Sequence, residues 1–199
     1  KGEDLTLDVL CRENLEGNWL DLGAGDGRYV SDLLKRVNHL VVADIDKTEL
    51  QKIQLCLSRQ ERLKVSVSVF DMAKRFPFGD RSFDGVFCTG TLHLFTPDKI
   101  AFILSEISRI LKSKGKIIID FATDVKRVLS DGNLEVIKDK PSYILEYKAV
   151  NAKKMLTEML KDYRLEFFQS TFEDDLTSNV SYGFHTKGNF FLVIGTRQL

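Results

Sequence analysis

The stretch that decides the fold is "NWLDLGAGDGRY", residues 18–29. A short apolar run ends here, and three glycines then alternate with small or acidic residues. A glycine loop that directly follows a strand lets the backbone approach a ligand closely. Asp21 and Asp26 lie in or beside this loop, so charge as well as shape selects the ligand.

The glycine spacing distinguishes two kinds of ligand. The dinucleotide fingerprint G-x-G-x-x-G places a pyrophosphate on a helix N-terminus. Here the glycines are Gly23, Gly25 and Gly27, so the third comes one residue early. Asp21 and Asp26 would also repel a pyrophosphate, although Asp26 alone is equally well explained as a helix cap. The loop therefore favours a ligand that carries positive charge.

Strands and helices alternate along the first part of the chain. This alternation predicts an α/β fold, with a mostly parallel sheet and helices on both faces. The helix over 96–112 would be capped by Thr96, with Pro97 at its first position, and would stop before Gly115. We expect strands over 18–22, 39–46, 63–71, 82–90 and 115–123, and helices over 27–37, 47–60 and 96–112.

The last third of the chain has a different pattern. A helix is expected over 150–163, and strands over 164–173 and 189–197 are expected to form an antiparallel pair at the sheet edge. Residues 124–149 have weak periodicity and contain the possible short strand "SYILEY". We interpret 124–149 as an insertion on the substrate side of the site.

Acidic residues recur where the predicted strands end. Asp44 ends the second strand and Asp71 the third, and Asp21 ends the first. Ligands of parallel sheets bind at the carboxyl ends of the strands. S-adenosylmethionine suits these acids, because it carries a sulfonium, an ammonium and two ribose hydroxyls. Asp46 competes with Asp44 for the ribose but has the position of a solvated acid at a helix start.

Four segments in order resemble one family. They are "LDLGAGDGRY" (20–29), "VVADID" (41–46), "FDMAKRFPFGDRSFDGVF" (70–87) and "ISRILKSKGKIIID" (107–120). Together they are similar to the class I S-adenosylmethionine-dependent methyltransferases of the small methyltransferase-domain type, and the similarity covers about residues 18–123. It implies one Rossmann-like domain over 1–199, with a seven-stranded sheet in the order 3-2-1-4-5-7-6. The strand over 189–197 would be the antiparallel strand 7.

The resemblance also assigns roles by position. Asp21 and the loop would hold the methionine portion, Asp44 the ribose, and Ile45 one face of the adenine, while Asp71 and Met72 would read the adenine edge. The cofactor-binding residues implied in this way are Asp21, Gly23, Ala24, Gly25, Gly27, Asp44, Ile45, Asp71, Met72, Thr89 and Gly90.

Methyl transfer from a sulfonium is an in-line displacement, so the protein mainly aligns the reactants. A base is needed only if the acceptor loses a proton. His93, just past the fourth strand, is the candidate base, and packing is its alternative role. Cys88 resembles a buried hydrophobe more than a nucleophile. The run "CTGTL" replaces the N-P-P-Y or D-P-P-Y run of enzymes that methylate adenine or glutamine amino groups.

The charge, cysteine spacing and apolar runs of the chain limit which partners we expect. Lys+Arg and Asp+Glu both total 29, so the net charge is zero and nothing draws the whole chain to nucleic acid. The chain lacks a C-x-x-C pair and a membrane-length apolar run, so we expect a cytoplasmic protein without a bound metal. The expected acceptor is a small molecule, methylated on oxygen or nitrogen. RNA or protein acceptors stay open, as does an NAD-binding dehydrogenase or a non-catalytic nucleotide-binding module.

Overall fold

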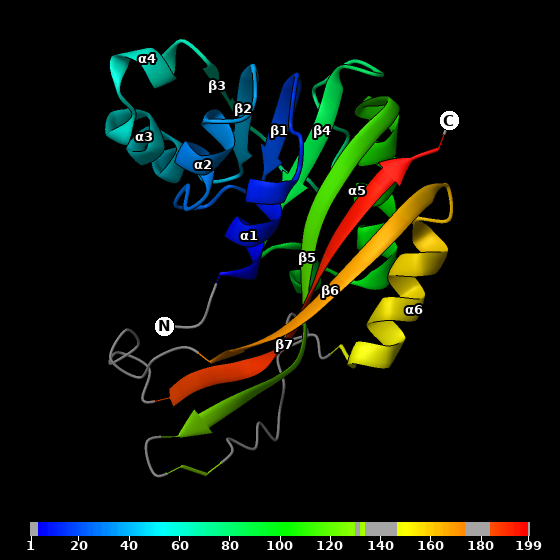
Figure 1. Ribbon diagram of the computed structural model, residues 1–199. Helices are drawn as coiled ribbons and strands as arrows, with labels where there is room; N and C mark the ends of the chain where they lie inside the picture. Colours follow the sequence, from blue (N-terminus) through cyan, green and yellow to red (C-terminus); the bar gives the residue numbers. More distant parts are fainter. Residues whose placement is uncertain (1–3, 130–131, 134–146, 174–183, 199) are drawn as a thin grey trace.

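The computed structural model describes residues 4–129, 132–133, 147–173 and 184–198. One seven-stranded sheet crosses the molecule in the order β3-β2-β1-β4-β5-β7-β6 (Figure 1). β7 pairs antiparallel with both β5 and β6, and the remaining pairs are parallel. The predicted fold class, strand order and antiparallel strand are therefore confirmed. The strands are β1 (Asn18–Leu22), β2 (His39–Asp44), β3 (Val65–Val69), β4 (Phe83–Cys88), β5 (Leu111–Leu129), β6 (Tyr163–Glu173) and β7 (Phe184–Arg197).

Helices cover both faces of the sheet. The apolar sides of α1, α2 and α3 pack with one cluster of buried side chains, and those of α5 and α6 pack with the other. The short helices α4 and η1 connect neighbouring elements. The bounds are α1 (Leu5–Arg12), α2 (Val30–Leu34), α3 (Lys47–Cys56), α4 (Arg59–Arg62), the 3₁₀ helix η1 (Leu92–Leu94), α5 (Pro97–Ile110) and α6 (Ala149–Met159). Within the described segments, no helix combines the length and apolar character needed to span a lipid bilayer.

Two predicted helices are shorter than expected. The helix predicted over 27–37 is only α2, because the glycine loop keeps its left-handed backbone as far as Gly27. The helix predicted over 47–60 ends at Cys56, where Leu57 turns to an extended conformation. Ser58 then starts α4 with a capping box completed by Glu61, which is a local signal for a second helix start.

The bounds of two neighbouring elements differ from the prediction. α5 ends at Ile110 rather than at Lys112, and Thr96 makes no side-chain cap bond although Pro97 does begin the helix. The following strand, β5, then runs on to Leu129 instead of giving way to an insertion at residue 124. Pairing with β7 carries β5 this far, and a strand partner 60 residues away leaves no local signal. Residues 134–146, which include most of "SYILEY", lie outside the described part.

The three last strands continue past the rest of the sheet. Figure 1 shows β5, β6 and β7 extending together beyond the ends of β1 to β4. β7 begins at Phe184, five residues earlier than predicted. The register shifts between Thr123 and Lys126 of β5, which changes the direction of the ribbon locally. The extended parts of β5, β6 and β7 therefore lie beside the carboxyl ends of the central strands.

The helix α1 was not predicted at all. Asp4 caps it by accepting hydrogen bonds from the backbone N–H groups of Thr6 and Leu7, at 3.0 and 3.2 Å. Val9 and Leu10 are fully buried on its inner side. α1 lies in front of the central strands (Figure 1), and its N-terminus points toward the end of the sheet where the ligand of a parallel fold is expected.

Candidate functional site

The glycine loop is held against the neighbouring strand β2. Gly23, Gly25 and Gly27 all have positive φ, between 52° and 77°, a region that side chains other than glycine rarely adopt. The N–H groups of Gly23 and Ala24 both donate to the carbonyl of Ala43, at 2.8 and 3.0 Å. The loop is therefore a fixed surface of backbone groups at the end of β1.

Asp44 fastens the centre of this loop. One carboxylate oxygen accepts the N–H of Gly25 at 2.9 Å, and the other accepts the N–H of Asp46 at 2.9 Å. Each oxygen keeps a lone pair that a ligand hydroxyl could use. Asp46 instead caps α3, where it accepts the N–H of Thr48. Asp44 lines the cleft, whereas Asp46 does not.

Asp21 is the most perturbed acid at the end of β1. Asp21 is only 4% exposed. Its burial, together with the nearby Asp44 carboxylate, raises the pKa of Asp21 to about 7. Both causes disfavour a second negative charge at this place. A cationic ligand would reverse the effect, because it would stabilise the ionised carboxylate. The electrostatics thus match the ligand charge that the sequence predicts.

These residues line a cleft of about 580 Å³, a size typical of small-molecule sites. The cleft contains ten of the eleven residues predicted to bind the cofactor. Gly27 does not line the cleft. A Cβ at Gly27 would stand 2.6 Å from the Ile53 side chain of α3, so the lack of a side chain there lets α3 pack closely against the loop. The full lining is Asp21, Gly23, Ala24, Gly25, Asp26, Arg28, Tyr29, Asp44, Ile45, Phe70, Asp71, Met72, Phe87, Thr89, Gly90, Thr91, Leu94, Phe95 and Asp120.

The far side of the cleft is less buried. Ile45 is 68% exposed, which leaves an apolar surface open to a flat ligand group. Asp71 follows the end of β3 and accepts the N–H of Ala73 at 2.9 Å. This bond fixes one oxygen of Asp71, while the other lies 3.6 Å from the ammonium of Lys74. Met72 is buried beside it.

A second cavity of about 750 Å³ adjoins the cleft. α1, the end of β4, and the extended parts of β5, β6 and β7 form its walls. Four residues line both spaces: Arg28, Tyr29, Gly90 and Asp120. The described lining of the second cavity is Asp4, Leu5, Thr6, Arg28, Tyr29, Gly90, His93, Asp120, Ala122, Val125, Ser170, Thr171, Phe172, Glu173, Thr186 and Phe190.

His93 lies in the second cavity and not in the cleft. Its ring packs edge to face on Phe121, with the ring centroids 6.2 Å apart. Burial lowers the pKa of His93, so the imidazole is neutral at pH 7. Its Nδ1 is buried and has no hydrogen-bond partner among the described residues. A neutral imidazole can accept a proton, and the His93 ring lines this cavity.

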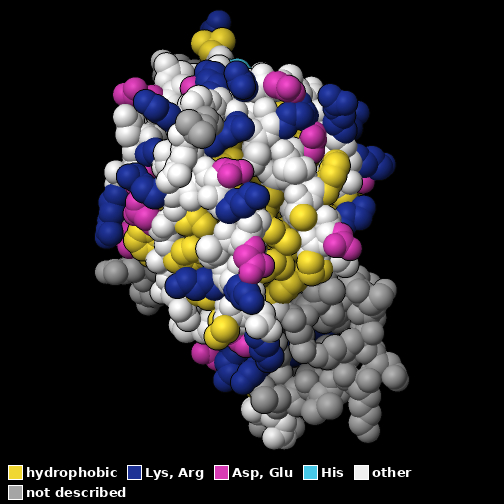
Figure 2. Space-filling model, turned by 90° about the vertical axis from the view of Figure 1, so that its right-hand side faces the viewer, with side chains coloured by type: hydrophobic (Ala, Val, Ile, Leu, Met, Phe, Trp, Pro, Cys, Tyr) yellow, Lys and Arg dark blue, Asp and Glu magenta, His cyan; other side chains and the backbone are white. Residues whose placement is uncertain are grey.

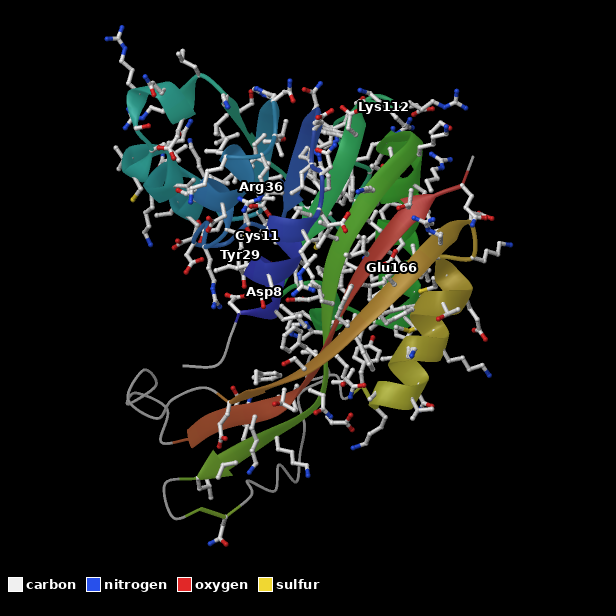
Figure 3. The ribbon with its side chains drawn as sticks, in the orientation of Figure 1. Asp8, Cys11, Tyr29, Arg36, Lys112 and Glu166 are labelled. Atoms are coloured by element: carbon white, nitrogen blue, oxygen red, sulfur yellow. The ribbon has the colours of Figure 1, made fainter. Side chains whose placement is uncertain are left out.

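α1 is tied to the glycine loop through Asp4. The Asp4 carboxylate lies 3.0 Å from the guanidinium of Arg28 and within 3.4 Å of the Tyr29 hydroxyl. Figure 3 shows Tyr29 beside α1, and its ring packs edge to face on Phe87. Asp4 thus connects a wall of the second cavity to the floor of the cleft.

Asp120 is the principal residue that the sequence analysis missed. It accepts the N–H of Gly90 at 2.7 Å, and burial raises its pKa to about 6. A sequence signal for Asp120 existed, because "KIIID" (116–120) is an apolar run followed by an acid. The same kind of pattern pointed to Asp21 in "NWLDL" (18–22). Thr91 was also missed; its hydroxyl donates to the carbonyl of Thr89 at 2.9 Å. No local pattern marks Asp4 or the β6 residues.

Other reactive side chains have simpler roles. Cys88 is fully buried, and burial raises its pKa well above the usual value, so it is a packing residue. His39 starts β2 and its Nε2 lies 3.0 Å from the Ser66 hydroxyl, far along the strands from the cleft. In the described part of the chain, no three His, Cys, Asp or Glu residues gather as metal ligands would.

Comparison with known proteins places this geometry in context. Residues 20–119 match the family model described as a methyltransferase domain. Among curated proteins, none gives a significant match. Solved structures do: the YcgJ protein of Bacillus subtilis is 16% identical with a TM-score of 0.71, over 98% of this chain and 97% of that one.

Two further structures resemble the chain. A SAM-dependent methyltransferase of Methanosarcina mazei is 17% identical with a TM-score of 0.67, over 98% of each chain. The DhpI protein in complex with SAH is 19% identical with a TM-score of 0.58, over 93% of this chain and 80% of that one. At these identities the similarity concerns the fold, and the family match covers the cleft-forming strands.

Proposed function

Because the chain belongs to the family of methyltransferase domains, we propose that its cleft binds the methyl donor and its second cavity the acceptor. The protein is a class I methyltransferase that uses S-adenosylmethionine, and S-adenosylhomocysteine is the product it leaves. The observation that carries the proposal is the junction of the two spaces at Gly90 and Asp120. A donor in one space and an acceptor in the other would meet there.

The proposed donor site uses three acids. Asp21, which favours positive charge, would face the sulfonium and ammonium groups of the methionine portion. Asp44, with a lone pair free on each oxygen, would accept the ribose hydroxyls. Asp71 and the Met72 backbone would contact the adenine edge, and exposed Ile45 would cover one adenine face. The backbone of the glycine loop would let the methionine portion approach closely.

We propose a small molecule as the acceptor, with oxygen or nitrogen as the methylated atom. The second cavity has the size of a small-molecule site. Its described lining contains three carboxylates but one guanidinium, which disfavours the phosphates of RNA. On the molecular face that carries α6, basic and acidic side chains are interspersed as well (Figure 2). A protein acceptor stays as the alternative that the experiment below addresses.

His93 is the proposed proton acceptor. Methyl transfer needs only alignment when the attacking atom already has a free lone pair. An acceptor that arrives with an extra proton must first lose it, and neutral His93 lines the acceptor cavity.

Calorimetric titration of the chain with S-adenosylmethionine, S-adenosylhomocysteine and NAD in parallel tests the donor site. We expect micromolar binding of the first two and no heat with NAD. Binding of NAD alone would overturn the proposal. Formation of S-adenosylhomocysteine is then measured with small amines and alcohols, with RNA, and with unfolded protein. Turnover with RNA or protein but with none of the small molecules would contradict the acceptor class.

A further inference from the structure

The carboxylate at the junction of the two spaces is Asp120. It lies on β5 beside Leu192 of β7, and it lines both the cleft and the second cavity. The N–H of Gly90 holds one of its oxygens at 2.7 Å. Among the described residues, the other oxygen has no hydrogen-bond partner. The carboxylate is thus fixed in place on one side and open on the other.

The charge of the second cavity is unbalanced around this residue. Arg28 and Asp4 pair with each other at 3.0 Å and largely cancel. The carboxylate of Asp120 also lines the cavity, and it forms no ion pair with a described lysine or arginine. A neutral or cationic guest is favoured in such a cavity, and an anionic guest is repelled.

The other walls are apolar or hydroxylic. Phe172 and Phe190 line one side, and Val125 lines the cavity from β5. Threonine and serine hydroxyls from α1, β6 and β7 complete the lining. An organic body with an aromatic or aliphatic part would pack against the apolar side, while a single polar head reaches Asp120.

From these observations we propose that the second cavity is an amine site, in which Asp120 binds the nitrogen that becomes methylated. This inference rests on the proposed function, because it names the acceptor of that same junction. Asp120 would accept a hydrogen bond from the amine N–H and hold the nitrogen lone pair in line with the methyl group.

The charge of the reaction moves toward Asp120. The amine nitrogen forms a bond to the methyl carbon, and the carbon–sulfur bond breaks with its electron pair going to sulfur. The sulfonium becomes the neutral thioether of S-adenosylhomocysteine, and the nitrogen becomes a methylammonium. A fixed carboxylate at the nitrogen stabilises this transfer of positive charge. An amine that enters as an ammonium first gives one proton to His93.

The test uses benzylamine and benzyl alcohol as matched probes of the full chain saturated with S-adenosylhomocysteine. Binding is followed through the amide resonance of Gly90, whose N–H contacts Asp120. We expect benzylamine to bind at least tenfold more tightly than benzyl alcohol. Equal binding of the two probes, or tighter binding of the alcohol, would overturn the amine site without any variant.

Two variants test which carboxylate causes the preference for benzylamine. Asp120→Asn keeps an oxygen for the Gly90 N–H but loses the charge, and we expect it to remove the preference for the amine. Glu173→Gln makes the same charge change at an exposed position of the same cavity, and we expect less than a threefold effect. Equal losses in both variants would overturn the role of Asp120 as the anchor.

Binding of S-adenosylhomocysteine and preference for benzylamine test the donor site and the amine site separately. If the parent protein does not bind S-adenosylhomocysteine, the donor site is wrong. If the parent binds S-adenosylhomocysteine but does not prefer benzylamine, the donor site stands and the amine site is wrong.

Discussion

At the scale of single residues, Asp21 balances stability against ligand binding. Its raised pKa of about 7 means that the folded protein binds a proton more tightly than the unfolded chain does. The stability that this proton confers is present below the unfolded pKa near 4 and is lost as the pH rises through 7. The cost at pH 8 is about 4 kcal/mol as an upper bound, at about 1.4 kcal/mol for each unit of pKa.

We therefore expect opposite effects of Asp21→Asn on the two properties. At pH 8 the variant should unfold at a higher urea concentration, because it carries no buried charge. It should bind S-adenosylmethionine at least tenfold more weakly. In the parent, affinity should fall from pH 7 to pH 5.5, because binding must then release a proton from Asp21. Calorimetry on both proteins isolates this residue from Asp120, which titrates in the same range.

The loop glycine Gly25 tests the closeness of the ligand. A Cβ on Gly25 would meet no atom within 4 Å, although its φ is +52°. Gly25→Leu should therefore fold with modest strain and reduce S-adenosylmethionine affinity by roughly 100-fold, because the side chain enters the cleft. Gly132, also with positive φ and open space, is the matched control. If Gly25→Leu and Gly132→Leu bind alike, the loop does not contact the ligand.

His93 belongs to the same scale. His93→Gln should leave S-adenosylmethionine affinity within twofold of the parent, because His93 does not line the cleft. Turnover of an amine that enters as an ammonium should fall by roughly 100-fold, and the loss should shrink as the pH rises and more of the amine is already neutral. Turnover that is unchanged at every pH would reduce His93 to a packing residue.

At the scale of elements, Arg109 fastens the loop after β3 to α5. Its guanidinium pairs with Glu106 at 2.7 Å and with Asp80 at 2.8 Å, and it donates to the carbonyls of Phe76 and Phe78. Glu106 in turn accepts the N–H of Phe76 and is only 8% exposed. One side chain thus holds a connection that carries Asp71 and Met72 at its start.

Removal of this guanidinium should destabilise the protein. Arg109→Met leaves the buried Glu106 carboxylate without its cation, and we expect a loss of about 3 kcal/mol in the free energy of unfolding. The exposed partner Asp80 is the control, since Asp80→Asn should cost less than about 0.5 kcal/mol. Urea unfolding measures both. A comparable loss in the two variants would mean that burial of Glu106 is not the cause.

The elements also show what the sequence could and could not predict. Strand and helix alternation identified every strand of the sheet, because buried apolar runs and amphipathic periods are local. The extent of β5 was missed because its outer half depends on pairing with β7. The acids at strand ends located the cleft, but the second cavity joins α1 to strands more than 100 residues away. Such a space leaves no periodic trace in the chain.

At the scale of the whole molecule, the sheet separates two apolar layers, and Trp19 lies in one of them. Trp19 is fully buried, and Gly85 of the adjacent strand β4 lies directly under its ring. A Cβ on Gly85 would stand 2.3 Å from two ring atoms. Since Trp19 is the only tryptophan, its fluorescence reports on this layer.

We expect Gly85→Ala to lower the free energy of unfolding by about 3 kcal/mol, because the ring must move within a packed layer. Gly79, which is exposed and would place a Cβ 3.4 Å from the Ser82 hydroxyl, is the control and should change little when replaced by alanine. Fluorescence and far-ultraviolet circular dichroism should give coincident unfolding curves. Two separate transitions would show that the layers unfold independently.

The junction at Asp120 and Gly90 divides the protein into halves with different freedom to change. One half, made of β1 to β4 and the glycine loop, is the proposed donor site, and the donor would be the same molecule for every acceptor. The other half is built from α1 and the outer ends of β5, β6 and β7, and it touches the donor half at four shared residues. Under the proposed function, we therefore expect substitutions in the outer half to leave donor binding unchanged. Exchange of α1 and the strand ends between relatives is a route by which evolution, or an engineer, can give the same methyl donor a new acceptor.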